Sequence, residues 1–193
     1  LLPSDRAPGH ERRLCLALHG HASAGGRLLC PEDLHAQVKQ ARDLHLQVFG
    51  SCPQGMWPSE GSVCPEMVEI LASNGITWAA TDEDILFASL RESRTGARLY
   101  KPYRVVHGES ALEMFFRDRA MADLIGFIYS KNPPQQAAAD FMGHLVNIRK
   151  ASKAYEFSPF VSIILDGENP WEYYPDGGEG FLRNLYQGLS HAD

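Results

Sequence analysis

Residues 76–81, with the sequence ITWAAT, constrain the fold more than any other part of the chain. The run is nearly all apolar, is rich in β-branched residues, and has helical sequence patterns on both sides. A strand of this composition is buried on both faces, as strands are in parallel sheets that helices cover. Three further stretches are expected to be strands: residues 55–57, 112–118 and 160–165. Strands that alternate with helices predict an α/β fold with a parallel sheet.

Helices are expected around these strands. Residues 31–49 begin with proline and acids, carry one apolar stripe at spacings of three and four, and end at Gly50. The stripe consists of Leu34, Val38, Ala41, Leu44 and Val48. The other expected helices span residues 64–74, 82–93, 119–130, 133–155 and 177–192. Residues 91–110 are expected to form a polar connection. Residues 1–30 are a poorly patterned segment, which leaves residues 31–193 as the patterned domain.

The composition disfavours several classes of function. The chain has 193 residues, of which 44% are hydrophobic and 22% charged, as in a globular protein with one core. Its net charge of −6 disfavours nucleic acid or an anionic membrane as the main partner, because both require clustered Lys and Arg. No apolar run approaches the ~18 residues of a membrane span, and no secretory signal pattern is visible at the N-terminus.

The cysteines and histidines give no indication of a cofactor. The four cysteines are Cys15, Cys30, Cys52 and Cys64. They lack CxxC spacing, which favours reduced thiols and a cytoplasmic protein. His19 and His21 would face the same way on a strand, but no third ligand follows at a recognisable spacing. We therefore expect neither a metal nor another cofactor.

Acidic and aromatic side chains gather where the expected strands end, which is where active sites form in parallel α/β folds. These residues are Trp57, Glu60, Asp82, Glu83, Asp84, Asp118, Asp166, Glu168, Trp171 and Glu172. Aromatic rings stack on sugars, and two carboxylates that flank a glycosidic bond can cleave it. The same acids also suit helix N-caps, for which Asp82 and Asp118 are well placed. Arg117 and Asp118 are either site residues or a structural ion pair.

Four segments of the chain resemble glycoside hydrolase family 57. They are FGSCPQGMWPSEGSV, ITWAATDEDIL, MFFRDRAMADLIGFIYS and ILDGENPWEYYPDGGEGFLRNLYQGL, which occur in this order within residues 31–193. The family acts on α-glucans with retention of configuration, and its amylopullulanase-like and α-amylase-like members are the most similar in these motifs. The resemblance implies an incomplete (β/α)7 barrel. Because the His-Gln-Pro motif of the family's first strand is missing, the chain is expected to be a central part of that barrel, truncated at both ends.

The resemblance also implies roles for individual residues. Glu60 matches the family's nucleophile and Asp166 its general acid/base, while Trp57 and Glu168 match residues that contact the substrate. Trp57 and Trp171 are each expected either to contact the sugar or to pack in the core. The implied partner is an α-glucan, and the implied activity is that of a glycosidase or a glucanotransferase.

Two other interpretations remain open at this point. Glu60 is alternatively a solvated turn acid and Asp166 a turn-forming Asp. The chain as a whole is alternatively a non-catalytic glucan-binding paralogue, or an inactive fragment that keeps the catalytic pair. A metal-dependent sugar deacetylase on a similar barrel would need an Asp-His-His site, which the sequence does not show.

Overall fold

The computed structural model describes residues 31–167 and 169–191. The segment 1–30, with His19 and His21, and the predicted site residue Glu168 therefore lie outside the described residues. The chain divides into two compact units. Unit 1 consists of Leu1–Thr81, Ala88–Arg91 and Pro102–Phe115, and unit 2 of Asp82–Phe87, Glu92–Lys101 and Phe116–Asp193.

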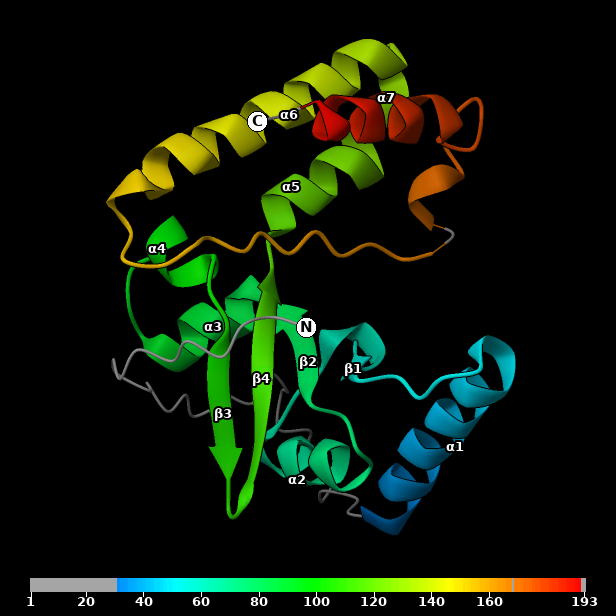
Figure 1. The fold of residues 1–193 in the computed structure, drawn as a ribbon, viewed down its shortest axis with the longest axis vertical. Coiled ribbons are helices and arrows are strands. Elements are labelled where there is room, and N and C mark those ends of the chain that lie inside the picture. Colours follow the sequence, from blue (N-terminus) through cyan, green and yellow to red (C-terminus); the bar gives the residue numbers. More distant parts are fainter. Residues whose placement is uncertain (1–30, 168, 192–193) are drawn as a thin grey trace, which may run out of the picture. The chain divides into compact units, whose positions relative to one another are not determined.

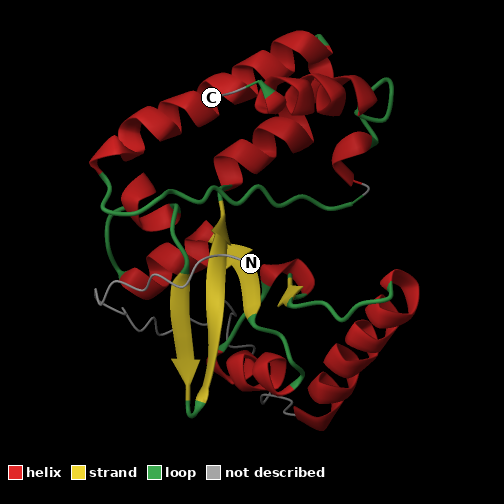
Figure 2. Cartoon of the chain, viewed as in Figure 1, coloured by secondary structure: helices red, strands yellow, loops and turns green. Residues whose placement is uncertain are grey.

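A four-stranded sheet confirms the expected α/β class (Figure 2). The strand order is β1-β2-β4-β3, and the strands are β1 (Gly55–Met56), β2 (Trp78–Asp82), β3 (Tyr103–His107) and β4 (Ser110–Arg117). β1 and β2 are parallel, with Gly55 opposite Trp78, as the crossover pattern predicted. β3 and β4 are antiparallel, so the prediction of a wholly parallel sheet was wrong.

The β3–β4 hairpin also corrects the prediction of a polar connection over residues 91–110. This stretch contains a short helix, α4 (Gly96–Leu99), and all of β3. Tyr103 and Val105 are buried while Arg104 between them is exposed, which is the alternation of a strand with one face on the core. Gly108 has a φ of 57° in the turn. Alternating apolar and polar residues followed by a glycine are typical of a β-hairpin. The polar residues around them led instead to the prediction of a connection.

The helices of unit 1 begin and end close to where the sequence predicted. They are α1 (Pro31–Phe49) and α2 (Pro65–Ser73), and α3 (Glu83–Leu90) contains residues of both units. Gly50 and Gly75, with φ of 74° and 80°, follow α1 and α2 closely. α2 packs against β3 (Figure 1). The predicted apolar stripe of α1 is largely exposed in the described chain, however: Leu44 and Val48 are 60% and 62% exposed.

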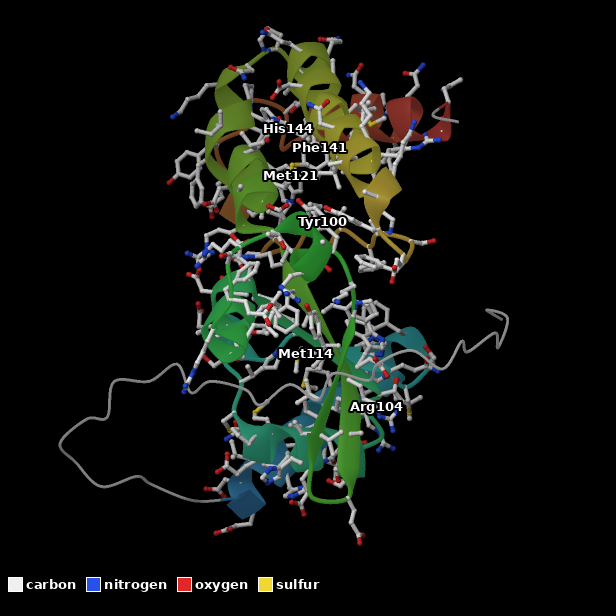
Figure 3. All side chains as sticks on the ribbon, turned by 90° about the vertical axis from the view of Figure 1, so that its left-hand side faces the viewer. Tyr100, Arg104, Met114, Met121, Phe141 and His144 are labelled. Carbon is white, nitrogen blue, oxygen red and sulfur yellow. The ribbon has the colours of Figure 1, made fainter. Side chains whose placement is uncertain are left out.

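Unit 2 is built around a helical core. Besides α4 and the first part of α3, its helices are α5 (Arg119–Asp123), a π-helical turn η2 (Leu124–Ile128), the 3-10 turns η3 (Tyr129–Lys131), η4 (Ser152–Ala154) and η5 (Asn169–Trp171), α6 (Pro134–Ala151) and α7 (Glu179–Ser190). α6 packs along α7 (Figure 1). Phe141 of α6 and Phe181 of α7 meet edge to face with ring centroids 6.3 Å apart. Met121 of α5 belongs to the same core (Figure 3).

The expected strand over residues 160–165 forms a single bridge instead of a ladder. Ser162 pairs in parallel with Arg117, and the amide of Asp118 donates to the carbonyl of Ser162 at 2.9 Å. The pairing cannot continue beyond Arg117, because Asp118 is already the N-cap of α5 and the chain turns away there. The prediction of a strand was therefore wrong, although the segment lies where a next parallel strand would begin.

No helix within the described residues is both long enough and apolar enough to span a membrane.

Candidate active site

Glu60 lies in a tight turn directly after β1. Ser59–Gly61 forms one 3-10 turn, η1, closed by hydrogen bonds from the Gly61 amide to the Pro58 carbonyl at 2.8 Å and from the Ser62 amide to the Ser59 carbonyl at 3.0 Å. Glu60 itself has φ 54° and ψ 21°. This left-handed conformation costs a side-chain-bearing residue about 1–2 kcal/mol, so the surrounding contacts must hold it there. The Glu60 side chain is exposed.

Two contacts of Gly61 fix this turn within unit 1. The hydroxyl of Thr81, which is 0% exposed at the end of β2, donates to the Gly61 carbonyl. On the other side the ring of Trp57 packs so closely that a Cβ on Gly61 would lie 2.9 Å from two ring carbons. Gly61 also has a φ of 64°, so both its conformation and its surroundings require glycine. Trp57 therefore has a packing role, and its contact with substrate stays a prediction.

Asp166 and Trp171 belong to unit 2. Asp166 is exposed and follows the segment that pairs with the end of β4 at Ser162. Trp171 is half-buried in η5; its ring lies 5.5 Å from that of Tyr174 and covers Gly178, where a Cβ would approach a ring carbon to 2.3 Å. Trp171 thus packs on the turn before α7. Its contact with substrate, like the acid/base role of Asp166, stays a prediction.

Asp82 is the centre of an ion-pair cluster in unit 2. Its carboxylate accepts hydrogen bonds from Arg117 at 2.8 Å and from Arg119 at 2.7 Å, and it caps α3 by accepting from the Asp84 amide at 2.9 Å. Asp84 in turn pairs with Arg119 at 2.6 Å and with Arg94. The predicted capping role of Asp82 is confirmed. Sequence reasoning missed its arginine partners, although TDED and RDR, at the ends of two strands, carry opposite charges.

Asp118 has a different set of partners from its neighbour Arg117. One carboxylate oxygen of Asp118 caps α5 by accepting from the Met121 amide at 3.0 Å, as the sequence predicted. The other accepts a hydrogen bond from the Tyr100 hydroxyl at 2.8 Å. Arg117 forms an ion pair with Asp82; the Arg117–Asp118 pair considered from the sequence stays a prediction.

Glu83 is a carboxylate held in an unfavourable environment. Its side chain is 17% exposed, and burial, together with the negative charges of Asp118, Asp82 and Asp84, raises its pKa above the ordinary value of 4.5. Arg94 opposes this shift from 3.7 Å. The folded chain therefore binds a proton at Glu83 more tightly than the unfolded chain does.

Replacement of Glu83 by glutamine should stabilise the fold at neutral pH. A raised pKa gives stability that is present below pH 4.5 and is lost as the pH rises and the buried carboxyl ionises. The free energy of unfolding in urea should therefore be higher for Glu83→Gln than for the parent at pH 7, and the difference should vanish towards pH 4. Glu69→Gln, at an exposed position on α2, should show no such trend. A parent that is more stable than Glu83→Gln at pH 7 would contradict this account.

Within residues 31–167 and 169–191, no group of three or more His, Cys, Asp or Glu side chains is arranged to hold a metal ion. Cys52 and Cys64 are free thiols.

Comparisons with known proteins identify the family of the chain and solved structures with a similar fold. The model of glycosyl hydrolase family 57 matches residues 22–193. No curated protein matches the chain. Among solved structures, the fold is similar to 4-alpha-glucanotransferase from Thermococcus litoralis, with a TM-score of 0.67 and 23% identity over 86% of this chain and 24% of that one. It is also similar to the alpha-amylase AmyC from Thermotoga maritima, with a TM-score of 0.67 and 12% identity over 84% of this chain and 42% of that one. The chain thus spans less than half the length of either protein.

Proposed function

The chain belongs to glycosyl hydrolase family 57, and we propose that it carries the catalytic pair of a retaining enzyme that acts on α-glucans. The proposal assigns the nucleophile to Glu60 and the general acid/base to Asp166, with Trp57, Glu168 and Trp171 on the substrate. It also makes the four-stranded sheet a part of a (β/α)7-type barrel. The names of the two similar structures, a glucanotransferase and an amylase, support α-glucan as the substrate class.

The mechanism proceeds in two displacements. Glu60 attacks the anomeric carbon, the bond to the leaving oxygen breaks, and Asp166 gives its proton to that oxygen. The ionised Asp166 then takes a proton from water or from a sugar hydroxyl, whose oxygen displaces Glu60 from the anomeric carbon. Water yields hydrolysis and a sugar yields transfer. Retaining glycosidases in general hold their two carboxyl groups about 5–5.5 Å apart.

The conformation of Glu60 is the observation that carries the proposal. Glu60 occupies a left-handed conformation that glycine would adopt more easily. Here the buried Thr81 hydroxyl and the Trp57 ring hold the turn from two sides. Backbone strain that the surroundings maintain is characteristic of functional sites, and a fixed carboxylate at the end of a strand is suited to attack a bound sugar.

The direct test is to trap the covalent intermediate. The chain, and a longer protein that contains it, would be incubated with 5-fluoro-α-glucosyl fluoride, which forms a glycosyl-enzyme that breaks down slowly. Mass spectrometry of proteolytic fragments should place the added sugar on Glu60, and Glu60→Gln should carry none. A label on another carboxylate, or none in a protein that cleaves α-glucans, would refute the assignment. Glucan binding without cleavage or label would support the non-catalytic alternative.

A further inference from the structure

The segment that ends at Asp166 is held by Tyr100 and Asp118, and all three residues belong to unit 2. The backbone amide of Phe160 donates to the Tyr100 carbonyl at 2.9 Å, and the Asp118 amide donates to the Ser162 carbonyl at 2.9 Å. These two hydrogen bonds join the segment to two separate parts of the chain, just past α4 and just past β4. They lie four to six residues before Asp166.

The side chains of the two holding residues are joined to each other. The Tyr100 hydroxyl (Figure 3) donates to one oxygen of Asp118 at 2.8 Å, while the other oxygen accepts from the Met121 amide at 3.0 Å. Asp118 is 5% exposed and Ser162 is 9% exposed. The two residues that make the backbone contacts with the segment are therefore joined to each other by one part-buried hydrogen bond. We call Tyr100, Asp118, Phe160 and Ser162 the clamp.

Electrostatics keep the hydroxyl in its donor form. Burial, the hydrogen bond to Asp118 and the nearby negative charges of Asp118 and Glu83 all raise the pKa of Tyr100. A phenol that does not ionise remains a donor to the Asp118 carboxylate at any pH at which a glycosidase works. Hydrogen bonds to charged groups in buried positions are also the stronger ones.

We propose that Tyr100 and Asp118 are positioning residues, which hold the segment from Phe160 to Asp166 so that the Asp166 carboxyl meets the leaving oxygen of the substrate. Neither residue needs to touch the substrate. The inference rests on the proposed acid/base role of Asp166. It adds the two residues that hold Asp166 in position. An acid displaced by about an ångström transfers its proton far less effectively.

Hydrogen–deuterium exchange tests the clamp without any need for activity. Tyr100→Phe in the full chain keeps the ring and removes the hydroxyl, and the amides of Phe160 and Asp118 should then exchange about tenfold faster. Amides of α6 and α7 should keep the rates of the parent. Tyr173→Phe, at a position that is 74% exposed, should change neither set. Unchanged exchange at both amides in Tyr100→Phe would overturn the proposal, as would equal acceleration across unit 2.

Kinetics in an active protein that contains the chain test the consequence for proton transfer. An α-glucan needs its leaving oxygen protonated, whereas α-maltosyl fluoride releases fluoride with little help from an acid. Tyr100→Phe should lower kcat/KM about tenfold for the glucan and leave it within about twofold for the fluoride. Equal losses on both substrates would indicate a general structural defect and overturn the positioning role. Asp166→Asn separates the two hypotheses: if it shows no preference for the fluoride, the acid/base assignment itself fails.

Discussion

We expect Glu60→Gln to lower kcat on an α-glucan by at least about 10^4-fold, while the affinity for the glucan should stay within about threefold. Glutamine has nearly the same shape as glutamate but cannot form the glycosyl ester, and loss of a nucleophile has costs of this order or larger. Steady-state kinetics and a binding isotherm on the same preparation measure the two effects. Glu69→Gln on the exposed face of α2 is the matched control and should retain full activity. A Glu60→Gln protein with more than about a tenth of the parent's kcat would contradict the nucleophile role.

Glu60→Gly separates the carboxylate from the conformation that it occupies. Glycine removes the left-handed strain of about 1–2 kcal/mol, which exceeds the additional backbone entropy of about 0.5–1 kcal/mol that glycine loses on folding. The free energy of unfolding should rise by up to about 1 kcal/mol while activity disappears. Stability gained at the expense of activity is the expected signature of a strained functional residue. A Glu60→Gly protein that is less stable than the parent would mean that the φ of 54° carries no strain.

Asp166→Asn lowers kcat/KM on an α-glucan by about 10^2- to 10^4-fold, the usual contribution of a positioned general acid. With α-maltosyl fluoride the loss in kcat/KM should be small, because fluoride leaves without a proton. Turnover of that fluoride should then be limited by the second displacement, which lacks its base. Added azide, a nucleophile that needs no base, should raise kcat and yield a glycosyl azide.

The control for Asp166→Asn is Glu179→Gln, which removes an acid on the exposed side of α7. It should leave both substrates unaffected, and azide should have no effect on it. Failure of azide to accelerate Asp166→Asn, together with equal losses on the glucan and the fluoride, would place the acid/base elsewhere.

Local patterns were enough to predict most of the helices. α1 and α2 begin at prolines and end near glycines with positive φ, and these signals depend only on neighbouring residues. The capping role of Asp118 was predictable for the same reason. The structure of residues 160–165 was not predictable in this way, because an apolar run has the same sequence pattern whether it forms a strand or only an extended segment. Whether it becomes a strand depends on a neighbouring strand to pair with, and β4 ends at Arg117, just before α5 begins.

In the candidate site, too, features that depend on neighbouring residues were predictable and features that depend on distant residues were not. The sequence motifs predicted Glu60 and Asp166 through a family resemblance. They could not show that Glu60 has a positive φ, because that conformation depends on a buried threonine at the end of another strand. The two arginines around Asp82 were likewise hidden, since they lie 35 and 37 residues away in the chain.

The position of β1 has a consequence for how the molecule folds. β3 and β4 are joined by a short turn and can pair as a local event, whereas β1 reaches β2 only after the whole of α2 has been placed between them. Contacts that are distant in sequence form more slowly than local ones. The hydrogen bond from Thr81 to the turn that carries Glu60 depends on this slower pairing of β1 with β2. We therefore expect the hairpin to fold first, and the reactive turn to be among the last parts of unit 1 to reach its native form.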